Sequence, residues 1–215
     1  MDIKCSALLL RSVRHLGQSC ILQVLTVERG LISLFANQRI DESLKTPFFW
    51  GEWVFHDRGQ NLHHVKEASA LELFENLKQN YASLTTAGQM ARLLLQTQLP
   101  EKKADGAVAL SLSYFRQLEH FEDPAILLAS FQLKLLAHEG LLYLSPVCNR
   151  CGARTSHLFH GESVCTEHAP AQSHPFCIDQ EGILLHCRTF SELKRLSLTA
   201  AVVQKINCIT NELTM

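Results

Sequence analysis

Hydrophobic and polar positions form short, strand-like segments through the first 66 residues. Residues with β-branched or aromatic side chains gather in five such segments, at residues 3–13, 20–27, 31–36, 48–55 and 62–65. Turn-forming residues separate the segments, among them Gly17, Gly30, Pro47 and Gly59. Five short strands with these turns predict a small β-barrel. Between the second and third segments, the pattern predicts a tight hairpin in which Gly30 takes a positive φ angle.

The spacing of apolar residues changes at residue 68, where the turn-forming residues also become fewer. Leu71, Phe74, Leu77 and Leu84 are spaced at threes and sevens, which places them on one face of an amphipathic helix. The pattern therefore predicts that a helical domain begins here. Further helices are expected at residues 86–98, 105–120, 124–140 and 190–213.

The helix expected at residues 124–140 carries clear start and stop signals. Asp123 is a candidate N-cap, Pro124 suits the first helical position, and Gly140 suits the C-terminal end. Its sequence is apolar on most sides, which predicts a buried position at the centre of a bundle.

An irregular segment rich in Cys, His, Gly and Pro interrupts the helical pattern after this helix. The chain is therefore expected to be an α+β protein with an N-terminal five-stranded barrel and an all-α domain that contains an insert. The expected boundaries are 1–66 for the barrel, 67–144 for the helical domain, 145–176 for the insert and 177–215 for the return to the helical domain.

Composition favours a globular protein of the cytosol. The chain has 215 residues, of which 47% are hydrophobic, and no apolar run approaches the length of a membrane span. The 20 Lys and Arg residues nearly balance 21 Asp and Glu, so no overall charge favours nucleic acid or a membrane surface. Any anion-binding surface must be local. In a reducing compartment, the eight cysteines are not expected to form a disulfide framework.

Two pairs of metal-ligating residues stand in the insert. Cys148 and Cys151 form a Cys-x-x-Cys pair, and Cys165 and His168 follow with the same spacing. Two such pairs can complete a tetrahedron around one Zn²⁺ ion, and four protein ligands leave no open position for a substrate. The pattern therefore predicts one structural zinc ion. Three other residues could replace His168 as the fourth ligand: His157, His174 and Cys177.

The sequence contains no complete catalytic motif among those compared: the zinc deaminase signature, the phosphate-binding loops and the nucleophile elbow. The insert contains the pieces of a zinc deaminase signature, but the order is reversed, because His160 and Glu162 follow the Cys-x-x-Cys pair. The chain contains no glycine-rich phosphate loop and no Gly-x-Ser-x-Gly elbow. The protein is therefore expected not to be an enzyme and to have no small-molecule substrate.

Basic residues of the barrel could form a local DNA-binding groove. The candidates stand on strands, at strand ends and in turns: Lys4, Arg11, Arg14, Arg29, Arg39 and Lys45. Nearby aromatic residues could supply stacking faces for bases: Phe48, Phe49, Trp50 and Trp53. In the alternative interpretation, the aromatic residues belong to the core and the charges form an ordinary solvated surface.

Three stretches of the chain resemble bacterial recombination mediators of the RecO family. They are ALLLRSVRHLGQSCILQVLTVERGLISLFA near the start, FQLKLLAHEGLLYLSPVCNRCGA later, and the CTEH pair. The resemblance implies an N-terminal OB-fold, a helical domain and an inserted zinc element in a protein of the bacterial cytosol and nucleoid. It also implies binding of single- and double-stranded DNA, annealing of complementary strands, and recombinase loading together with RecR and single-stranded-DNA-binding protein.

Two departures from the family pattern change these expectations. Members of the family commonly carry a basic stretch of the form K-G-A-R-R-x-x-x-S after the third strand, whereas this chain reads ANQRIDESLK at residues 36–45. Asp41 and Glu42 oppose the basic residues that remain, which predicts weak intrinsic DNA binding and a larger role for protein partners. His168 stands where a Cys is common in the family. A protein-interaction adaptor with little DNA binding of its own is the alternative function.

Overall fold

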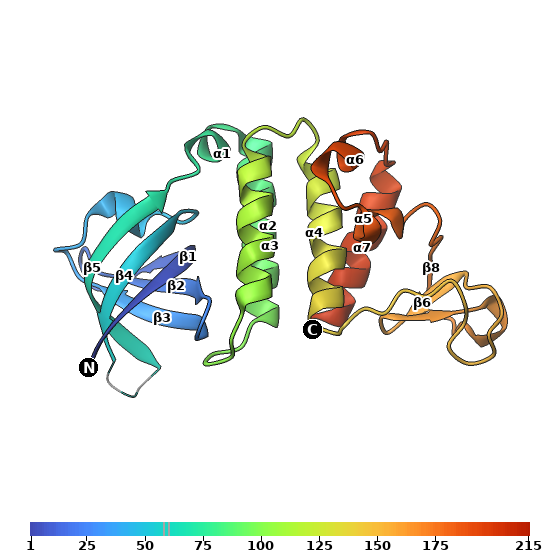
Figure 1. The fold of residues 1–215 in the computed structure, drawn as a ribbon, viewed down its shortest axis with the longest axis horizontal. Coiled ribbons are helices and arrows are strands. Elements are labelled where there is room, and N and C mark those ends of the chain that lie inside the picture. The colour runs from blue at the N-terminus through green and yellow to red at the C-terminus, as the bar shows by residue number, and fades with distance from the viewer. Residues whose placement is uncertain (58, 60) are drawn as a thin grey trace. The chain divides into compact units, whose positions relative to one another are not determined.

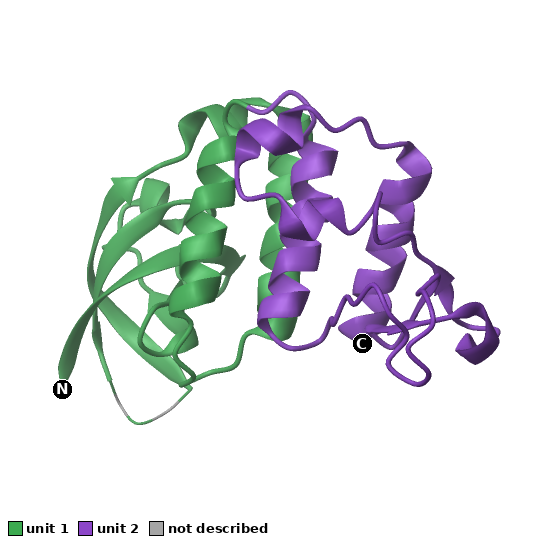
Figure 2. Cartoon of the chain, turned by 45° about the vertical axis from the view of Figure 1, so that its right-hand side comes forward, with its two compact units in different colours: residues 1–120 green, residues 121–215 purple. Residues whose placement is uncertain are grey.

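The computed structural model describes residues 1–57, 59 and 61–215. The chain divides into two compact units, residues 1–120 and residues 121–215 (Figure 2). The barrel belongs to the first unit and the metal-ligating residues to the second. The finer division at residues 66, 144 and 176 stays a prediction.

Five strands of the first unit form a closed barrel with the order β1-β2-β3-β5-β4 (Figure 1). The strands are β1 (Asp2–Arg14), β2 (Cys20–Thr26), β3 (Gly30–Ala36), β4 (Trp50–His56) and β5 (Leu62–Glu72). All neighbours are antiparallel except β3 and β5, and β4 pairs with β1 to close the ring. A short 3₁₀ helix, η1 (Glu42–Lys45), precedes β4. This is the arrangement of an OB-fold barrel, which confirms the expected fold.

Side chains alternate between the inside and the outside of the barrel. In β3, Ile32, Leu34 and Ala36 are buried in the barrel core, whereas Ser33 and Phe35 between them are only half-buried. The period of two along a strand explains this alternation. Successive residues of β3 therefore serve two purposes, one stabilising the core and the other forming an outer surface.

The hairpin between β2 and β3 has the predicted positive φ angle at Gly30, which is +59°. A methyl group at this position would lie 2.4 Å from the carbonyl oxygen of Lys102 and 2.5 Å from that of Leu99. Glycine is therefore required both by the turn and by the close approach of the loop that follows α2 (Tyr81–Thr97).

The change from strand to helix comes later than the spacing predicts. Strand β5 continues to Glu72, so the helical prediction for residues 68–72 is wrong. Ala68 and Ala70 pack against the barrel core and pair with Trp53 and Gly51 of β4. Tertiary pairing thus decides the conformation of this segment. Helices α1 (Glu75–Gln79), α2 and α3 (Asp105–Leu118) complete the unit, and α2 begins before the predicted residue 86.

The second unit is built on α4 (Pro124–His138), which begins and ends as its sequence predicts. The Asp123 carboxylate accepts a hydrogen bond of 3.1 Å from the Ala125 N–H, and Gly140 has a φ angle of +74°. Residues on every side of α4 are buried, and α7 (Ala200–Leu213) packs against it. The prediction of a buried central helix is confirmed.

The last predicted helix is interrupted. Residues 190–213 form α6 (Phe190–Lys194) and α7, with a break at residues 195–199. The hydroxyl groups of Thr189 and Thr199 cap the two helices separately by accepting hydrogen bonds from backbone N–H groups. The prediction of a single helix at residues 190–213 is therefore wrong, because Thr189 and Thr199 each cap the start of a separate helix.

The insert carries three short strands that form a separate sheet with the order β7-β6-β8. They are β6 (His157–Phe159), β7 (Glu162–Val164) and β8 (His174–Pro175), with the 3₁₀ turn η2 (Thr166–His168) after β7 and helix α5 (Ile183–His186) after β8. Across the residues that the structure describes, none of the helices has the length and apolar character needed to cross a membrane.

Candidate functional site

The first metal-ligating pair lies in a tight turn of the insert. The Cys148 carbonyl accepts a hydrogen bond of 2.9 Å from the Gly152 N–H, and the Cys148 N–H donates one of 2.7 Å to the Ala153 carbonyl. Gly152 has a φ angle of +74°, which favours glycine. The turn therefore brings the sulfur atoms of Cys148 and Cys151 to the same side.

The second pair is presented by the sheet of the insert. Cys165 follows β7 directly, and the His168 N–H donates a hydrogen bond of 3.1 Å to the Cys165 carbonyl within the turn η2. This turn reverses the chain so that the imidazole of His168 faces the Cys165 sulfur. The short sheet thus fixes the second pair of ligands opposite the first.

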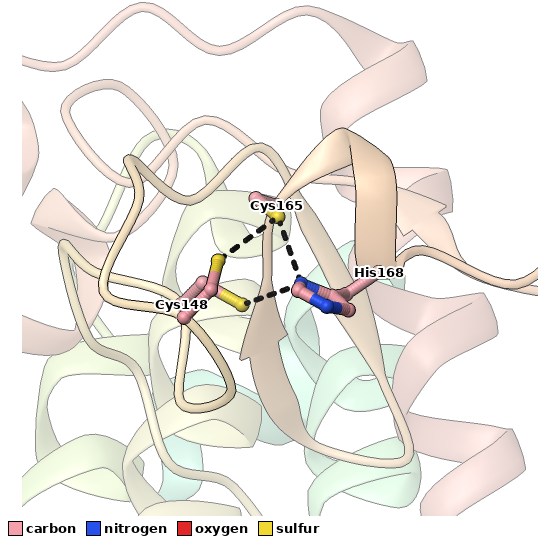
Figure 3. Close-up of side chains that lie close together, drawn as sticks. Cys148, Cys165 and His168 are labelled. Carbon is pink, nitrogen blue, oxygen red and sulfur yellow. Dashed lines mark hydrogen bonds between the residues drawn. The ribbon is translucent and has the colours of Figure 1, made fainter.

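The four side chains meet at one point. One ligand atom from each of Cys148, Cys151, Cys165 and His168 lies within 4.8 Å of the other three. The His168 Nδ1 atom is 3.3 Å from the Cys165 sulfur and 3.7 Å from the Cys148 sulfur, and Figure 3 shows the three labelled side chains pointing toward one another. These four residues could hold one metal ion, and three sulfur atoms with an imidazole are a donor set that suits Zn²⁺.

Local interactions lower the pKa of one of the three cysteine thiols. Burial raises the pKa of the Cys148 thiol, but backbone hydrogen bonds from Arg150, Cys165 and Cys151 oppose burial and lower the pKa to about 6. At neutral pH Cys148 is therefore a thiolate, which is the form that binds metals.

The alternative fourth ligands lie outside this cluster. The Nε2 atom of His174 is 2.7 Å from the Glu212 carboxylate, and the Nδ1 atom of His157 is 2.8 Å from the Ser156 hydroxyl. Cys177 is exposed. The structure therefore places His168, rather than His157, His174 or Cys177, with the three cysteines.

Three of the six basic candidates on the barrel are already engaged by other groups. Lys4 lies 3.0 Å from the Glu52 carboxylate, and Arg29 binds Glu101 and Asp57. The Lys45 side chain is only 2% exposed, and its ammonium group donates to the Gln18 carbonyl and to Glu42. Their charges are therefore largely compensated within the unit.

The other three basic candidates, Arg11, Arg14 and Arg39, are exposed, and none forms an ion pair within the described part of the chain. Arg14 lines a cleft of about 330 Å³ beside the loop between β1 and β2. Arg11 precedes Arg14 in the same strand, β1, and Arg39 lies in the loop after β3. The assignment of all six residues to DNA binding stays a prediction.

Three of the four suggested stacking residues pack against other rings of the protein: Phe48, Phe49 and Trp53. Phe49 and Trp53 are fully buried and stack on each other in the barrel core, with ring centroids 5.5 Å apart. Phe48 packs against Phe115, with ring centroids 5.7 Å apart. The alternative interpretation, that these rings belong to the core, is therefore confirmed for Phe49 and Trp53.

Another group of rings lies on the outside of the barrel and was not singled out from the sequence. Phe35 of β3 lies between His15 and His64, with ring centroids 6.1 Å and 5.0 Å away. The available signal was the alternation in residues 31–36, which places Phe35 opposite to the core residues Leu34 and Ala36.

Comparison with known proteins identifies the family. The protein-family model described as "Recombination protein O C terminal" matches residues 78–213 of this chain. DNA repair protein RecO of Chlamydia pneumoniae is 32% identical over 219 residues, covering 96% of this chain and 86% of the relative. DNA repair protein RecO of Chlamydia trachomatis serovar D is 28% identical over 177 residues, covering 76% of this chain and 72% of the relative. The chain therefore belongs to the RecO family of DNA repair and recombination proteins.

Proposed function

We propose that this protein is a non-catalytic recombination mediator that binds single- and double-stranded DNA with its OB-fold barrel. The observation that carries the proposal is the combination of family membership with a closed barrel that exposes Arg11 and Arg14 without acidic partners among the described residues. Guanidinium groups bind phosphates without reading sequence. Annealing of complementary strands requires such binding and no covalent chemistry.

The charge pattern narrows the predicted DNA-binding set. Arg11, Arg14 and Arg39 can each offer a guanidinium group to a phosphate, whereas Lys4, Arg29 and Lys45 would first have to leave their present partners. A set of three cations predicts modest affinity with a shallow dependence on salt, because that dependence grows with the number of phosphates that are neutralised. This supports the expectation that protein partners contribute to the activity.

The partners that we propose are RecR and single-stranded-DNA-binding protein, with which the chain would load recombinase at gaps in the bacterial cytoplasm. The family membership supports this proposal. Its test is a strand-annealing assay on DNA coated with single-stranded-DNA-binding protein. Acceleration by this chain, and retention of RecR on the chain in a pull-down, are the expected results. No acceleration and no retention would contradict the proposed partnership.

DNA binding is tested by fluorescence anisotropy of a labelled oligothymidine across a salt series. Arg11→Ala combined with Arg14→Ala should weaken binding and reduce the dependence on salt, because fewer counterions are released. Lys66→Ala combined with Lys103→Ala is the matched control, since both lysines are exposed and already paired with Asp2 and Asp105.

Two results would contradict direct DNA binding by the barrel. One is the absence of salt-sensitive binding by the unmodified protein, which would favour the protein-interaction adaptor. The other is an equal loss in the two double variants, which would show that net charge matters more than the position of Arg11 and Arg14.

We also propose that Cys148, Cys151, Cys165 and His168 hold one structural zinc ion. Cys148 and Cys165 are buried in a small core with Val164, so the site supports folding of the insert. Cys148→Ser should release the metal and lower the stability of the second unit. Cys208→Ser is the control, because Cys208 is exposed and lies outside the cluster. Metal content by mass spectrometry and thermal unfolding measure both effects, and one retained zinc ion in Cys148→Ser would contradict the assignment.

A further inference from the structure

Strand register divides the outer face of the barrel into two rows. In the first row, Arg11 of β1 pairs with Gln23 of β2, Gln23 with Ser33 of β3, and Ser33 with Leu62 of β5. Directly paired residues point to the same side of a sheet, and the chain neighbours Leu22 and Leu34 point into the core. The first row is therefore an outward row that begins with an arginine.

The second row lies two residues further along each strand. Val13 pairs with Ile21, Ile21 with Phe35, and Phe35 with His64. Its members are half-buried or exposed, and Val13 is 42% exposed. The second row is thus apolar and aromatic, directly beside a row that carries a cation.

Three rings converge on this second row from different parts of the chain. His15 comes from the loop between β1 and β2, Phe35 from β3, and His64 from β5. The His15 and Phe35 rings meet edge to face at 82°, and the Phe35 and His64 rings are tilted at 48°. We name the group of His15, Ile21, Phe35 and His64 the stacking face.

We propose that the stacking face receives unpaired bases of single-stranded nucleic acid while Arg11 binds the neighbouring phosphate. The inference rests on the proposed function and assigns the single-strand part of it to these residues. Bases stack on aromatic side chains without sequence preference, and β2, β3 and the loop after β1 form the side of an OB-fold suited to this contact. The arginine supplies the complementary charge.

The stacking face gives a reason for discrimination between single strands and duplexes. In a duplex the faces of the bases are covered by neighbouring bases, so the protein reaches mainly the phosphates and the groove edges. Arg11 and Arg14 can act on both kinds of DNA, whereas Phe35 can stack only on an unpaired base. Removal of the Phe35 ring should therefore affect single strands selectively.

The test compares the affinity of Phe35 variants for oligothymidine and for a duplex of equal length at one salt concentration. Phe35→Ala should weaken oligothymidine binding about tenfold or more and leave duplex binding unchanged within about twofold. Phe35→Tyr retains a ring and should bind like the unmodified protein. Phe35→Leu keeps apolar bulk without a ring, so it should show the same selective loss even if Phe35→Ala folds poorly. Tyr81→Ala, which removes an 85% exposed ring of α2, should change neither affinity.

The possible failures are distinguishable. Unchanged oligothymidine binding in Phe35→Leu, with binding lost after the change of Arg11 and Arg14, would overturn the stacking face and leave the proposed function intact. Equal losses for oligothymidine and duplex in Phe35→Leu would also overturn it, because they indicate a general defect of the barrel. If the unmodified protein binds neither DNA, the proposed function and the stacking face both fail.

Discussion

At the scale of single residues, the lowered pKa of the Cys148 thiol predicts a dependence on pH for the four candidate metal ligands. Its pKa is lowered to about 6 from the ordinary 9.0, since backbone hydrogen bonds outweigh the effect of burial. A lowered pKa means that the folded state favours the thiolate. The resulting contribution to stability is complete above pH 9, declines as the pH falls, and is absent below about pH 6.

We expect the metal-free protein to gain thiolate absorbance at 240 nm as the pH rises through about 6. The same titration of Cys148→Ser should lack this first step, and both proteins should show the later steps of the remaining cysteines. A first step that appears only above about pH 8 in the unmodified protein would contradict the hydrogen-bonded thiolate.

A buried carboxylate fixes the chain after the insert. The Glu181 side chain is 6% exposed, pairs with the Lys205 ammonium of α7, and accepts a hydrogen bond of 3.2 Å from the Cys177 N–H. Asp179 nearby pairs with Arg154, but both side chains of that pair are largely exposed. The two ion pairs therefore offer a direct comparison between a buried and an exposed carboxylate.

Glu181→Gln should lower the free energy of unfolding by about 1.5–3 kcal/mol, because a charged hydrogen-bond acceptor is lost from a buried position. Asp179→Asn should cost less than about 1 kcal/mol, since water screens the exposed pair. Urea unfolding measures both variants. Equal effects would show that Glu181 is not the anchor that the contacts indicate.

Single residues can be assigned from the sequence where their chemistry requires a fixed spacing. The four candidate metal ligands could be found because two x-x spacings can place four donor atoms around one ion. The environments of Lys45 and Phe35 could not be found in this way, because they depend on distant residues. The Lys45 ammonium is buried by contact with the Gln18 carbonyl, and the Phe35 ring gains its neighbours through strand pairing with β5.

At the scale of elements, the β6–β7 hairpin depends on a close backbone approach. Gly161 has a φ angle of +79°, and a methyl group there would lie 2.1 Å from the Leu141 carbonyl oxygen. Gly140 has a similar φ angle of +74° but nothing within 4 Å of the same position. Substitution of each glycine by alanine therefore separates two free-energy costs. Gly140 bears only the cost of the positive φ angle, whereas Gly161 also bears the cost of a steric clash.

Gly161→Ala should therefore lower the free energy of unfolding more than Gly140→Ala, by at least about 1 kcal/mol, since both variants bear the strain of a positive φ angle. Chemical unfolding of the two variants gives this difference. Similar stabilities would mean that the hairpin can shift away from residue 141 at little cost.

Elements were predicted well where local signals act alone. Asp123, Pro124 and Gly140 define α4 from the sequence, because capping is a local interaction. The end of β5 was misplaced because Ala68 and Ala70 are held by β4 rather than by their own propensity. The break between α6 and α7 was missed because apolar spacing continues across Thr199, whose hydroxyl starts the second helix.

At the scale of the whole molecule, the two proposed sites lie in different compact units. The stacking face belongs to residues 1–120, and the four candidate metal ligands belong to residues 121–215. The sites share no residue, so each can be removed without direct damage to the other. The family and the OB-fold could be anticipated from the sequence, whereas the outer face that is proposed to meet DNA required the strand register.

Hydrogen exchange of the zinc-loaded protein with and without oligothymidine is the most direct test of DNA binding by the barrel, because it reports where DNA meets the full chain. We predict slower exchange of backbone amides in β1, β2, β3 and the loop that contains His15. Amides of the second unit should change little. Protection confined to residues 121–215, with the barrel unchanged, would contradict DNA binding by the barrel.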